Sequence, residues 1–292
     1  MDAVITYVNG NDPLWQQDFR AAVPGVPVAR RYRDWGTLPF LLRGIERHMA
    51  FIDRVLLVVA RESQVPDWLD CAQVQVILHA DIIPEAFLPT FNSTTIELFL
   101  HRIPGLSERF LYFNDDIFPL QDINEMDFFP EGRPAIGFAR HLFSGNLFKR
   151  QTRNADALAR QALGLRLGAL FLRPQHTCSP MLRSACEEVF DRLGSRLFDT
   201  ITLVRDAKNV NQYLFSDYQL LSGRAVARRV PSRHLSLATA TPAMLGKAIR
   251  QPNQKILCLN DVDMEPHRFE TLREAMQMAF TAHFPKKSRY ER

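Results

Sequence analysis

The sequence has few cysteines and no long apolar run. Its four cysteines are scattered along 292 residues without a C-x-x-C pair: Cys71, Cys178, Cys186 and Cys258. This spacing indicates neither a zinc site nor a disulfide framework, and it favours a reducing compartment. The longest purely apolar stretch, Val55 to Ala60, is far shorter than the ~20 residues that a bilayer-spanning helix needs. We therefore expect no membrane-spanning segment.

A targeting signal and a charge excess are also lacking. Residues 1–8 show no basic region followed by an apolar one, so we expect no secretory signal and a cytoplasmic protein. Lysine and arginine outnumber the acidic residues by only 36 to 32, and the charges are interspersed. This distribution indicates no nucleic-acid surface, although a mild basic bias suits an anionic substrate. The 46% hydrophobic content excludes disorder as the dominant state.

Apolar runs alternate with segments of helical periodicity. Strands are expected at residues 3–8, 54–60, 74–78, 110–113 and 255–259, and helices at 38–48, 96–103 and 180–193. Such alternation predicts an α/β fold, doubly wound and Rossmann-like, with a mostly parallel sheet flanked by helices. Residues 231–254, rich in Pro, Ser, Thr and Ala, predict a loop. We interpret the whole chain, 1–292, as one domain with a helical insert at 144–172.

Two acidic turns follow predicted strands. Asn114-Asp115-Asp116 comes directly after the strand at 110–113, and Asn260-Asp261 follows the strand at 255–259. Open α/β sheets bind ligands at the carboxyl ends of their strands, and Mg²⁺ prefers carboxylates together with substrate phosphates. The two turns therefore predict one Mg²⁺ or Mn²⁺ site that holds a nucleotide diphosphate. Ordinary turn chemistry is the alternative at both places.

Three further features suit a phosphorylated ligand. Asn9-Gly10-Asn11-Asp12 ends the first strand, where a glycine lets the backbone approach a ligand, although a plain β-turn explains it equally well. His176 precedes a predicted helix and could act as a general acid or base, and Arg205 suits a phosphate. Both residue types are also common on surfaces. Neither a G-x-G-x-x-G fingerprint nor a P-loop occurs.

The insert at 144–172 alternates arginines with leucines. This pattern would suit a helix lying on a membrane surface, as a peripheral contact. A solvated helix packed on the core is the alternative. The arginines alone do not decide between the two.

Taken in order along the chain, these segments resemble the Stealth family of sugar-phosphate transferases, which includes bacterial capsular polysaccharide phosphotransferases and the animal N-acetylglucosamine-1-phosphotransferase of lysosomal targeting. The resemblance rests on DAVITYVNGNDP (2–13), RYRD (31–34) with LRGIE (42–46), LPTFNS (88–93), HRIPGLS (101–107), YFNDD (112–116), PQH (174–176), RD (205–206) with NQYL (211–214), CLND (258–261) and FPKKSRYE (284–291). Tyr7 and the Trp35-Gly36-Thr37 segment with Pro39 depart from the family's usual residues.

The resemblance implies transfer of a sugar-1-phosphate from a nucleotide-diphosphate sugar, such as UDP-N-acetylglucosamine, to a hydroxyl of a glycan or lipid-linked glycan. The products would be a phosphodiester and a nucleoside monophosphate, in capsular or cell-surface polysaccharide synthesis. Two alternatives remain open: a metal-dependent glycosyltransferase that uses the same donor, and a catalytically silent subunit that binds sugar nucleotides.

The resemblance also implies roles for individual residues. The implied catalytic residues are His176 as the base, Arg205 as a stabiliser of the transferred phosphoryl group, and Asp116. The implied metal ligands are Asp115, Asp116, Asn260 and Asp261. The implied donor-binding residues are Asn9, Gly10, Asp12, Arg33, Asp34, Asn92, His101 and Arg102.

Overall fold

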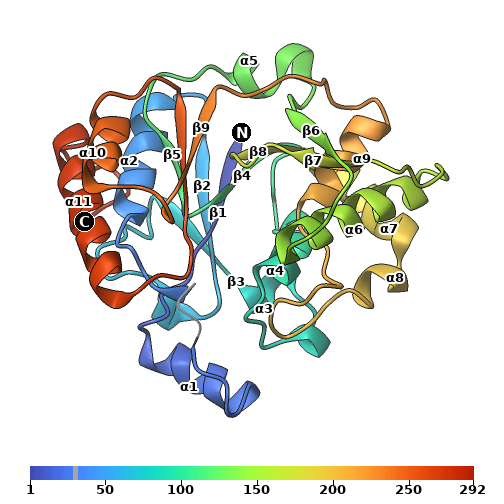
Figure 1. Cartoon of the computed structure of the whole chain (residues 1–292), viewed down its shortest axis with the longest axis horizontal. Coiled ribbons are helices and arrows are strands. Elements are labelled where there is room, and N and C mark those ends of the chain that lie inside the picture. Colours follow the sequence, from blue (N-terminus) through green and yellow to red (C-terminus); the bar gives the residue numbers. More distant parts are fainter. Residues whose placement is uncertain (29–31) are drawn as a thin grey trace.

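A five-stranded sheet forms the centre of the protein in the computed structural model, which describes residues 1–28 and 32–292 (Figure 1). Its order is β3-β2-β1-β4-β8, with bounds Val74–Leu78, Arg54–Val59, Asp2–Thr6, Arg109–Asn114 and Ser179–Leu182. The first four strands are parallel, and β8 runs antiparallel to β4 at one edge. The predicted α/β fold with a mostly parallel sheet is confirmed. Arg31, the first residue of the RYRD segment, lies outside the described residues.

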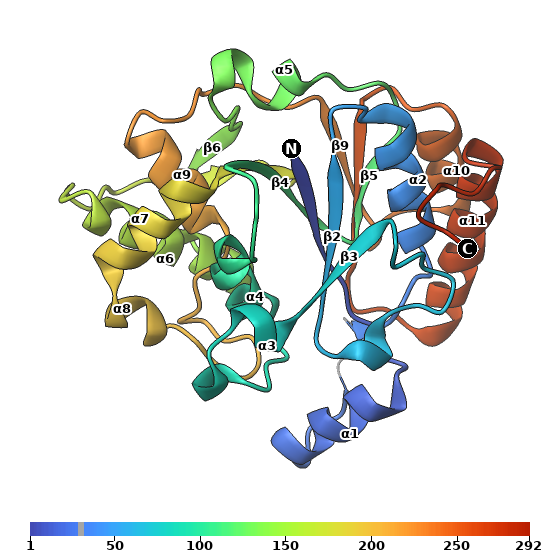
Figure 2. The same cartoon turned by 180° about the vertical axis from the view of Figure 1, so that it is seen from behind.

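Helices cover both faces of this sheet (Figures 1 and 2). Near-continuous apolar runs are typical of parallel strands that are buried on both sides. In β1, Ala3 and Ile5 belong to the hydrophobic cluster under α2, α10 and α11, whereas Val4 belongs to the cluster under α4, α7 and α9. The bounds of these six helices are Leu38–His48, Pro242–Arg250, Pro266–His283, Ser93–Phe99, Arg183–Leu193 and Tyr213–Leu221.

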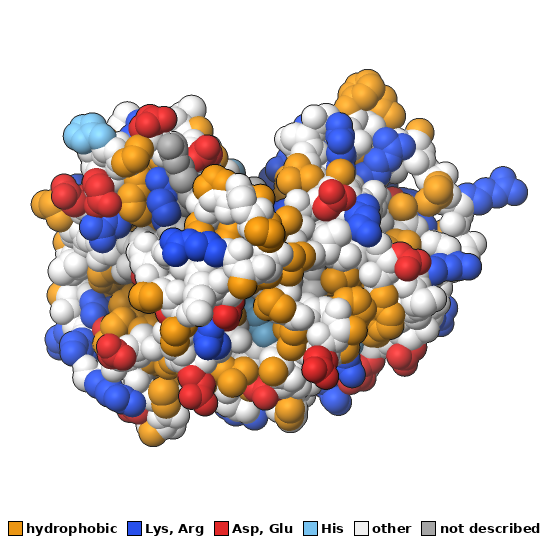
Figure 3. Space-filling view, turned by 90° about the horizontal axis from the view of Figure 1, so that it is seen from below, with side chains coloured by type: hydrophobic (Ala, Val, Ile, Leu, Met, Phe, Trp, Pro, Cys, Tyr) orange, Lys and Arg blue, Asp and Glu red, His pale blue; other side chains and the backbone are white. Residues whose placement is uncertain are grey.

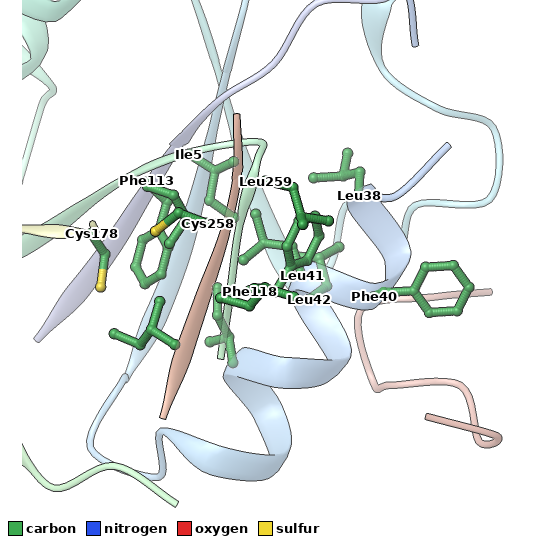
Figure 4. Close-up of a cluster of buried hydrophobic side chains, with 14 of the residues drawn as sticks. Ile5, Leu38, Phe40, Leu41, Leu42, Phe113, Phe118, Cys178, Cys258 and Leu259 are labelled. Carbon is green, nitrogen blue, oxygen red and sulfur yellow. The ribbon is translucent and has the colours of Figure 1, made fainter. Parts of the chain in front are cut away.

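A second, three-stranded sheet continues from the first. Its order is β5-β10-β9, with bounds Ile117–Pro119, Ile256–Asn260 and Ser232–Ser236. The chain passes from β4 in one sheet to β5 in the other through two residues, Asp115 and Asp116. Figure 4 shows side chains of both sheets and α2 gathered in one cluster, while Phe40 points away from it. Phe40 stacks instead on Phe280 of α11, with ring centroids 5.2 Å apart.

The predicted insert contains one long helix. This helix, α6 (Leu147–Ala162), follows the strand β6 (Phe138–His141), and the chain returns through β7 (Phe171–Pro174), which pairs antiparallel with β6. The buried residues Ala155 and Ala159 turn one face of α6 to the core. The structure shows the helix of the insert packed on the core. The peripheral membrane contact of the insert stays a prediction.

The structure corrects two predictions of secondary structure. The helix expected over 180–193 is present but begins at Arg183, because Pro180 lies in β8, and a proline is tolerated in a strand at the edge of a sheet. The segment expected to be a loop at 231–254 contains β9 and α10. Thr241 caps α10 through its side chain and Pro242 occupies the first turn, so residues typical of loops here mark the start of a helix.

The remaining elements are short or peripheral. The helix α1 spans Pro13–Ala22. The other α-helices are α3 (His79–Ile82), α5 (Glu125–Phe128) and α8 (Ser195–Phe198), and single 3₁₀ turns occur at 62–64, 85–87, 100–102 and 130–132. Across the described residues, none of the helices combines the length and the apolar character that a bilayer-spanning segment requires.

Candidate active site

A cavity of about 300 Å³ opens where three strands end. Thr6 ends β1 and Asn114 ends the neighbouring parallel strand β4, so both lie at the same edge of the central sheet. The strand β10 runs antiparallel to β5, which brings its carboxyl end to the same place, and the Leu259 N–H donates to the Asp116 carbonyl oxygen at 2.9 Å. The predicted site residues that line the cavity are Arg33, Asp34, Asp115, Asp116, His176, Arg205, Asn260 and Asp261.

The cavity brings several carboxyl groups together. Burial, together with the charges of Asp116, Asp34 and Asp261, raises the pKa of Asp115 to about 8. Burial also raises the pKa of Asp261, whose Oδ2 accepts a hydrogen bond from Trp35 Nε1 at 3.1 Å. Asp116 Oδ1 is buried without a hydrogen-bond partner among the described residues. A cation at this point would lower the repulsion and give Oδ1 a partner.

His176 and Asp116 form a pair in the cavity. The His176 Nε2 lies 3.3 Å from Asp116 Oδ2, and both side chains are about one-quarter exposed. Burial alone would lower the pKa of His176, but the charge and hydrogen bond of Asp116 and the charge of Glu97 raise it above its ordinary value. Because a carboxylate only accepts, Nε2 carries a proton in this bond, which leaves Nδ1 as the basic nitrogen of a neutral ring.

Glu97 is a site residue that the sequence reasoning missed. It lies on α4, lines the cavity with a 5% exposed side chain, and accepts a hydrogen bond from the Gln212 N–H at 2.8 Å. Burial raises its pKa, while the charges of Arg205 and His176 oppose that shift. A signal in the sequence could have found it, because Glu97 lies between Ile96 and Leu98 in a predicted helix. A glutamate that is buried with such apolar neighbours needs a polar partner inside the protein.

Positive charge faces the acids. The Arg205 Nη2 donates to Ser93 Oγ, at the first residue of α4, at 2.6 Å. The Arg33 guanidinium lies 4.2 Å from the ring centroid of Phe269. With the imidazole of His176, these two arginines give the cavity three groups that suit phosphate oxygens.

Asn92 orders the site from outside the cavity. Its Oδ1 caps α4 by accepting the Thr94 N–H at 3.2 Å, and its Nδ2 donates to Asn209 Oδ1 at 2.9 Å. Asn209 in turn accepts the Asp206 N–H at 2.6 Å. This buried pair of asparagines therefore joins the start of α4 to the loop that carries Arg205.

The first loop does not line the cavity at the residues predicted to bind the donor. Asn9 Oδ1 accepts the Asn11 N–H at 2.9 Å, and Asp12 Oδ1 caps α1 through the Leu14 N–H at 3.0 Å. Gly10 donates its N–H to the Tyr32 carbonyl at 2.8 Å, and a Cβ there would lie 2.2 Å from that oxygen. The interactions of Asn9, Gly10 and Asp12 with the protein itself match the plain-turn alternative.

His101 and Arg102 also lie away from the cavity. His101 is buried with its ring centroid 4.9 Å from that of Phe190, and burial lowers its pKa to about 4. Arg102 is exposed, with its guanidinium 5.8 Å from the Phe99 ring centroid. Both side chains pack against aromatic rings of the core, which accounts for them without a ligand.

Of the residues that depart from the family's usual pattern, Tyr7, Trp35 and Thr37 line the cavity. Tyr7 donates its hydroxyl to Asp34 Oδ2 at 3.1 Å, and Trp35 holds Asp261 as described above. Gln277 of α11 donates to the carbonyl oxygens of Trp35 and Gly36, at 2.8 and 2.7 Å. The C-terminal helix thus fixes the turn that presents Asp34 and Trp35.

Comparison with known proteins shows which family this chain is similar to. Two family models match, Stealth protein conserved region 2 over residues 31–135 and conserved region 4 over residues 247–292. A capsular polysaccharide phosphotransferase of Streptococcus pneumoniae is 30% identical, with 90% of this chain and 90% of the relative covered. The chain belongs to the Stealth family. A receptor polysaccharide phosphotransferase of Streptococcus oralis is 30% identical over 89% of this chain and 90% of the relative. An exopolysaccharide phosphotransferase of Lactiplantibacillus plantarum is 28% identical over 100% and 96%.

The two matched Stealth regions supply the acidic side of the cavity. Region 2 includes β4 and the Asp115-Asp116 turn, and region 4 includes β10 and Asp261. His176 and Arg205 lie between the two matches, so their assignment to further Stealth motifs stays a prediction, as does that of residues 2–13. The Stealth chain therefore brings residues of both matched regions together with His176 and Arg205 in one cavity.

Proposed function

We propose that this Stealth protein transfers a sugar-1-phosphate from a nucleotide-diphosphate sugar to a hydroxyl of an acceptor glycan. One observation carries the proposal: the Asp115-Asp116 turn meets Arg33, Arg205 and His176 in a single cavity. This arrangement offers cationic groups for a diphosphate and a histidine for proton transfer. The named relatives, which act as polysaccharide phosphotransferases, support the same class of reaction.

The acidic turn suits Mg²⁺ or Mn²⁺. Asp116 Oδ1 is buried and has no hydrogen-bond partner within residues 1–28 and 32–292, and Asp115 is subject to the repulsion of three neighbouring carboxyl groups. The described residues contain no cluster of three His, Cys, Asp or Glu side chains that could hold a metal alone. Mg²⁺ takes one or two carboxylates and completes its octahedron with water and substrate phosphates. Asp116 and Asp115 would hold the ion, with Asn260 and Asp261 beside them, and the bound ion would neutralise charge on the diphosphate.

The remaining groups suit in-line phosphoryl transfer. His176, oriented by Asp116, takes the proton of the acceptor hydroxyl on Nδ1 as the acceptor oxygen bonds to the phosphorus that bears the sugar. The phosphoanhydride bond breaks on the opposite side, and its electron pair leaves with the nucleoside monophosphate. Arg205 stabilises charge on the transferred group, and the carboxylate of buried Glu97 interacts electrostatically with Arg205 and His176. Positioning and charge stabilisation supply most of the acceleration in such reactions.

Identification of the released nucleotide tests this function. The purified protein is incubated with UDP-N-acetylglucosamine or another nucleotide sugar, Mg²⁺ and a pool of glycan acceptors, and the nucleotides are separated by chromatography. A nucleoside monophosphate together with a phosphodiester-bearing product supports the proposal. A nucleoside diphosphate would instead show glycosyl transfer. Donor binding without turnover on any acceptor would show a silent binding subunit.

A further inference from the structure

The segment from β6 to β7 carries an unusual concentration of positive charge. Residues 138–173 contain seven Lys and Arg but one acidic residue, Asp156, a net charge of +6 against +4 for the entire chain. Asp156 is buried and paired with Arg160, with Nε 2.7 Å from Oδ2. The exposed surface of the segment is therefore basic, and its exposed cations are Arg140, Arg150, Arg153 and Arg166.

The same segment exposes apolar side chains. Of the eleven large hydrophobic residues that are exposed in the described chain, six lie between positions 142 and 170. Phe143 is 77% exposed and Leu167 is 70% exposed. The six residues are Leu142, Phe143, Leu147, Leu165, Leu167 and Leu170. Exposed apolar groups in such number mark an interaction surface.

The fold places these residues on two neighbouring loops. The ladder of β6 and β7 pairs His141 with Phe171, so the loop that follows β6 and the loop that precedes β7 begin at the same end of the ribbon. The rings of this pair lie 5.9 Å apart between centroids. Figure 3 shows an apolar tip with Lys and Arg side chains around it on the lobe that contains α6 to α9. We call residues 142–147 and 163–170 the loop pair.

The chemistry of the loop pair favours a lipid surface as its partner. Aliphatic and aromatic side chains interleaved with arginines match an anionic bilayer, where cations meet lipid phosphates and apolar groups enter the acyl boundary. A soluble polyanionic glycan would match the arginines but would leave Phe143 and Leu167 in water. We propose that the loop pair binds the surface of an anionic lipid bilayer, with Phe143 and Leu167 inserted and the flanking arginines on lipid phosphates.

The first loop of the pair, 142–147, leads directly into the part of α6 that lines the cavity. Phe148 and Gln151 of α6 line the cavity, and the Arg173 guanidinium of β7 lies 5.7 Å from the Phe148 ring centroid. Docking through the loop pair would hold the cavity near the bilayer, where a lipid-linked acceptor presents its glycan. That consequence rests on the proposed function, whereas bilayer binding itself does not.

Co-sedimentation with vesicles tests the proposal. The protein should pellet with phosphatidylcholine vesicles that contain phosphatidylglycerol and stay in solution with phosphatidylcholine alone. The substitutions Phe143→Asp and Leu167→Asp should each lower vesicle affinity at least about tenfold. Arg150→Glu and Arg166→Glu should each lower it about fivefold or more. Matched controls on the opposite lobe are Met278→Asp, at a 73% exposed methionine of α11, and Lys286→Glu, and neither should change binding.

Three results would overturn the proposal. The first is absence of binding to anionic vesicles, and the second is an equal loss in the control variants. The third is binding of a soluble polyanionic polysaccharide that the arginine variants abolish and the apolar variants leave intact, which would make the loop pair a glycan surface. Turnover on a soluble acceptor is measured in parallel and should be unchanged in all variants, so a failure of the proposed function leaves the vesicle result readable.

Discussion

His176 Nε2 and Asp116 Oδ2 lie 3.3 Å apart, although 60 positions separate the two residues in the chain. The pair forms because β7 delivers His176 to the carboxyl end of β4, where Cys258 Sγ, on β10, donates to the His176 carbonyl oxygen at 3.1 Å. Asp116 thus has two functions available at once. One oxygen orients the imidazole, and the other is buried without a hydrogen-bond partner in the part of the chain that the structure describes.

Asp116→Asn should lower turnover at least about a hundredfold and leave the fold intact, because the amide can neither attract a cation nor orient His176 through a charge. Initial rates with saturating donor and Mg²⁺, together with circular dichroism, measure the two effects. Asp191→Asn, at an exposed aspartate on α7, is the matched control and should behave as wild type. A variant with full, metal-independent activity at position 116 would contradict the proposed site.

His176→Gln should lower kcat by about 10²-fold to 10⁴-fold and change the shape of the pH profile. The base must be neutral to accept a proton, and Asp116 raises the pKa of His176 above its ordinary value. The wild-type kcat/KM should therefore rise with pH through a pKa above the ordinary histidine value, and the variant should lack that limb. Near-wild-type rates in the variant would place the base elsewhere.

The stability of the metal-free protein should fall as pH rises. The folded-state pKa of Asp115 is about 8, raised from 3.8, so the folded form binds a proton that the unfolded form has released. This contribution is complete below the ordinary aspartate pKa and is lost as pH rises through about 8. Thermal unfolding of wild type and Asp115→Asn across this range measures it, and the variant should show the shallower decline. Parallel curves for the two proteins would show that Asp115 is not the group responsible.

Asn92→Ala should destabilise the protein by about 1–3 kcal/mol, since it removes a helix cap and leaves buried groups without partners. Activity should fall as well, because the loop that carries Arg205 loses its anchor at Asn209. The control is Asn146→Ala. Asn146 caps α6 because its Oδ1 accepts the Lys149 N–H, and the substitution removes this cap. It should lower stability by about 1 kcal/mol and leave turnover on a soluble acceptor unchanged. Equal activity in both variants would contradict the anchoring role of Asn92.

Gly10→Ala should destabilise the protein by about 1–3 kcal/mol or displace the segment at Tyr32, because the new Cβ meets a backbone oxygen that cannot retreat as a side chain would. Chemical denaturation gives the free energy of unfolding. Gly145→Ala serves as the control, since nothing lies within 4 Å of a Cβ there. A neutral Gly10→Ala would show that the close approach to Tyr32 is readily relieved.

The four parallel strands of the central sheet could be predicted because they are buried on both faces and appear as continuous apolar runs. The strand β9 could not, since Ser232, Arg233 and His234 lie at the edge of the second sheet and only Leu235 of that strand is buried. Composition indicated a loop there, because the composition of a segment carries no information about its pairing with a strand that is distant in the sequence. The helix α10 was missed for the same reason. Its threonine cap and proline resemble a turn in the sequence, and only the packing of the following residues on the core shows a helix.

The acidic half of the site was accessible from sequence, because acids that follow strands reach the same sheet edge whatever the details of packing. The course of the first loop was not. Asn9 and Asp12 occupy an equally suggestive place after β1, but the loop folds back on itself and on Tyr32. Glu97 lies on a helix, and its hydrogen bond from the Gln212 N–H depends on the course of a loop that the sequence does not predict.

Asp115 and Asp116 are the two residues that lead from β4 in one sheet to β5 in the other, so the candidate site lies at a junction between the sheets. The position of their carboxylates is set by how β4 and β5 pair with strands from opposite ends of the chain, β1 and β10. Secondary structure can therefore form in either half of the protein before the cavity exists. During refolding, the capacity to bind a donor should emerge last, and a chain cut before β10 should keep the acidic turn but lose the geometry that makes it a site.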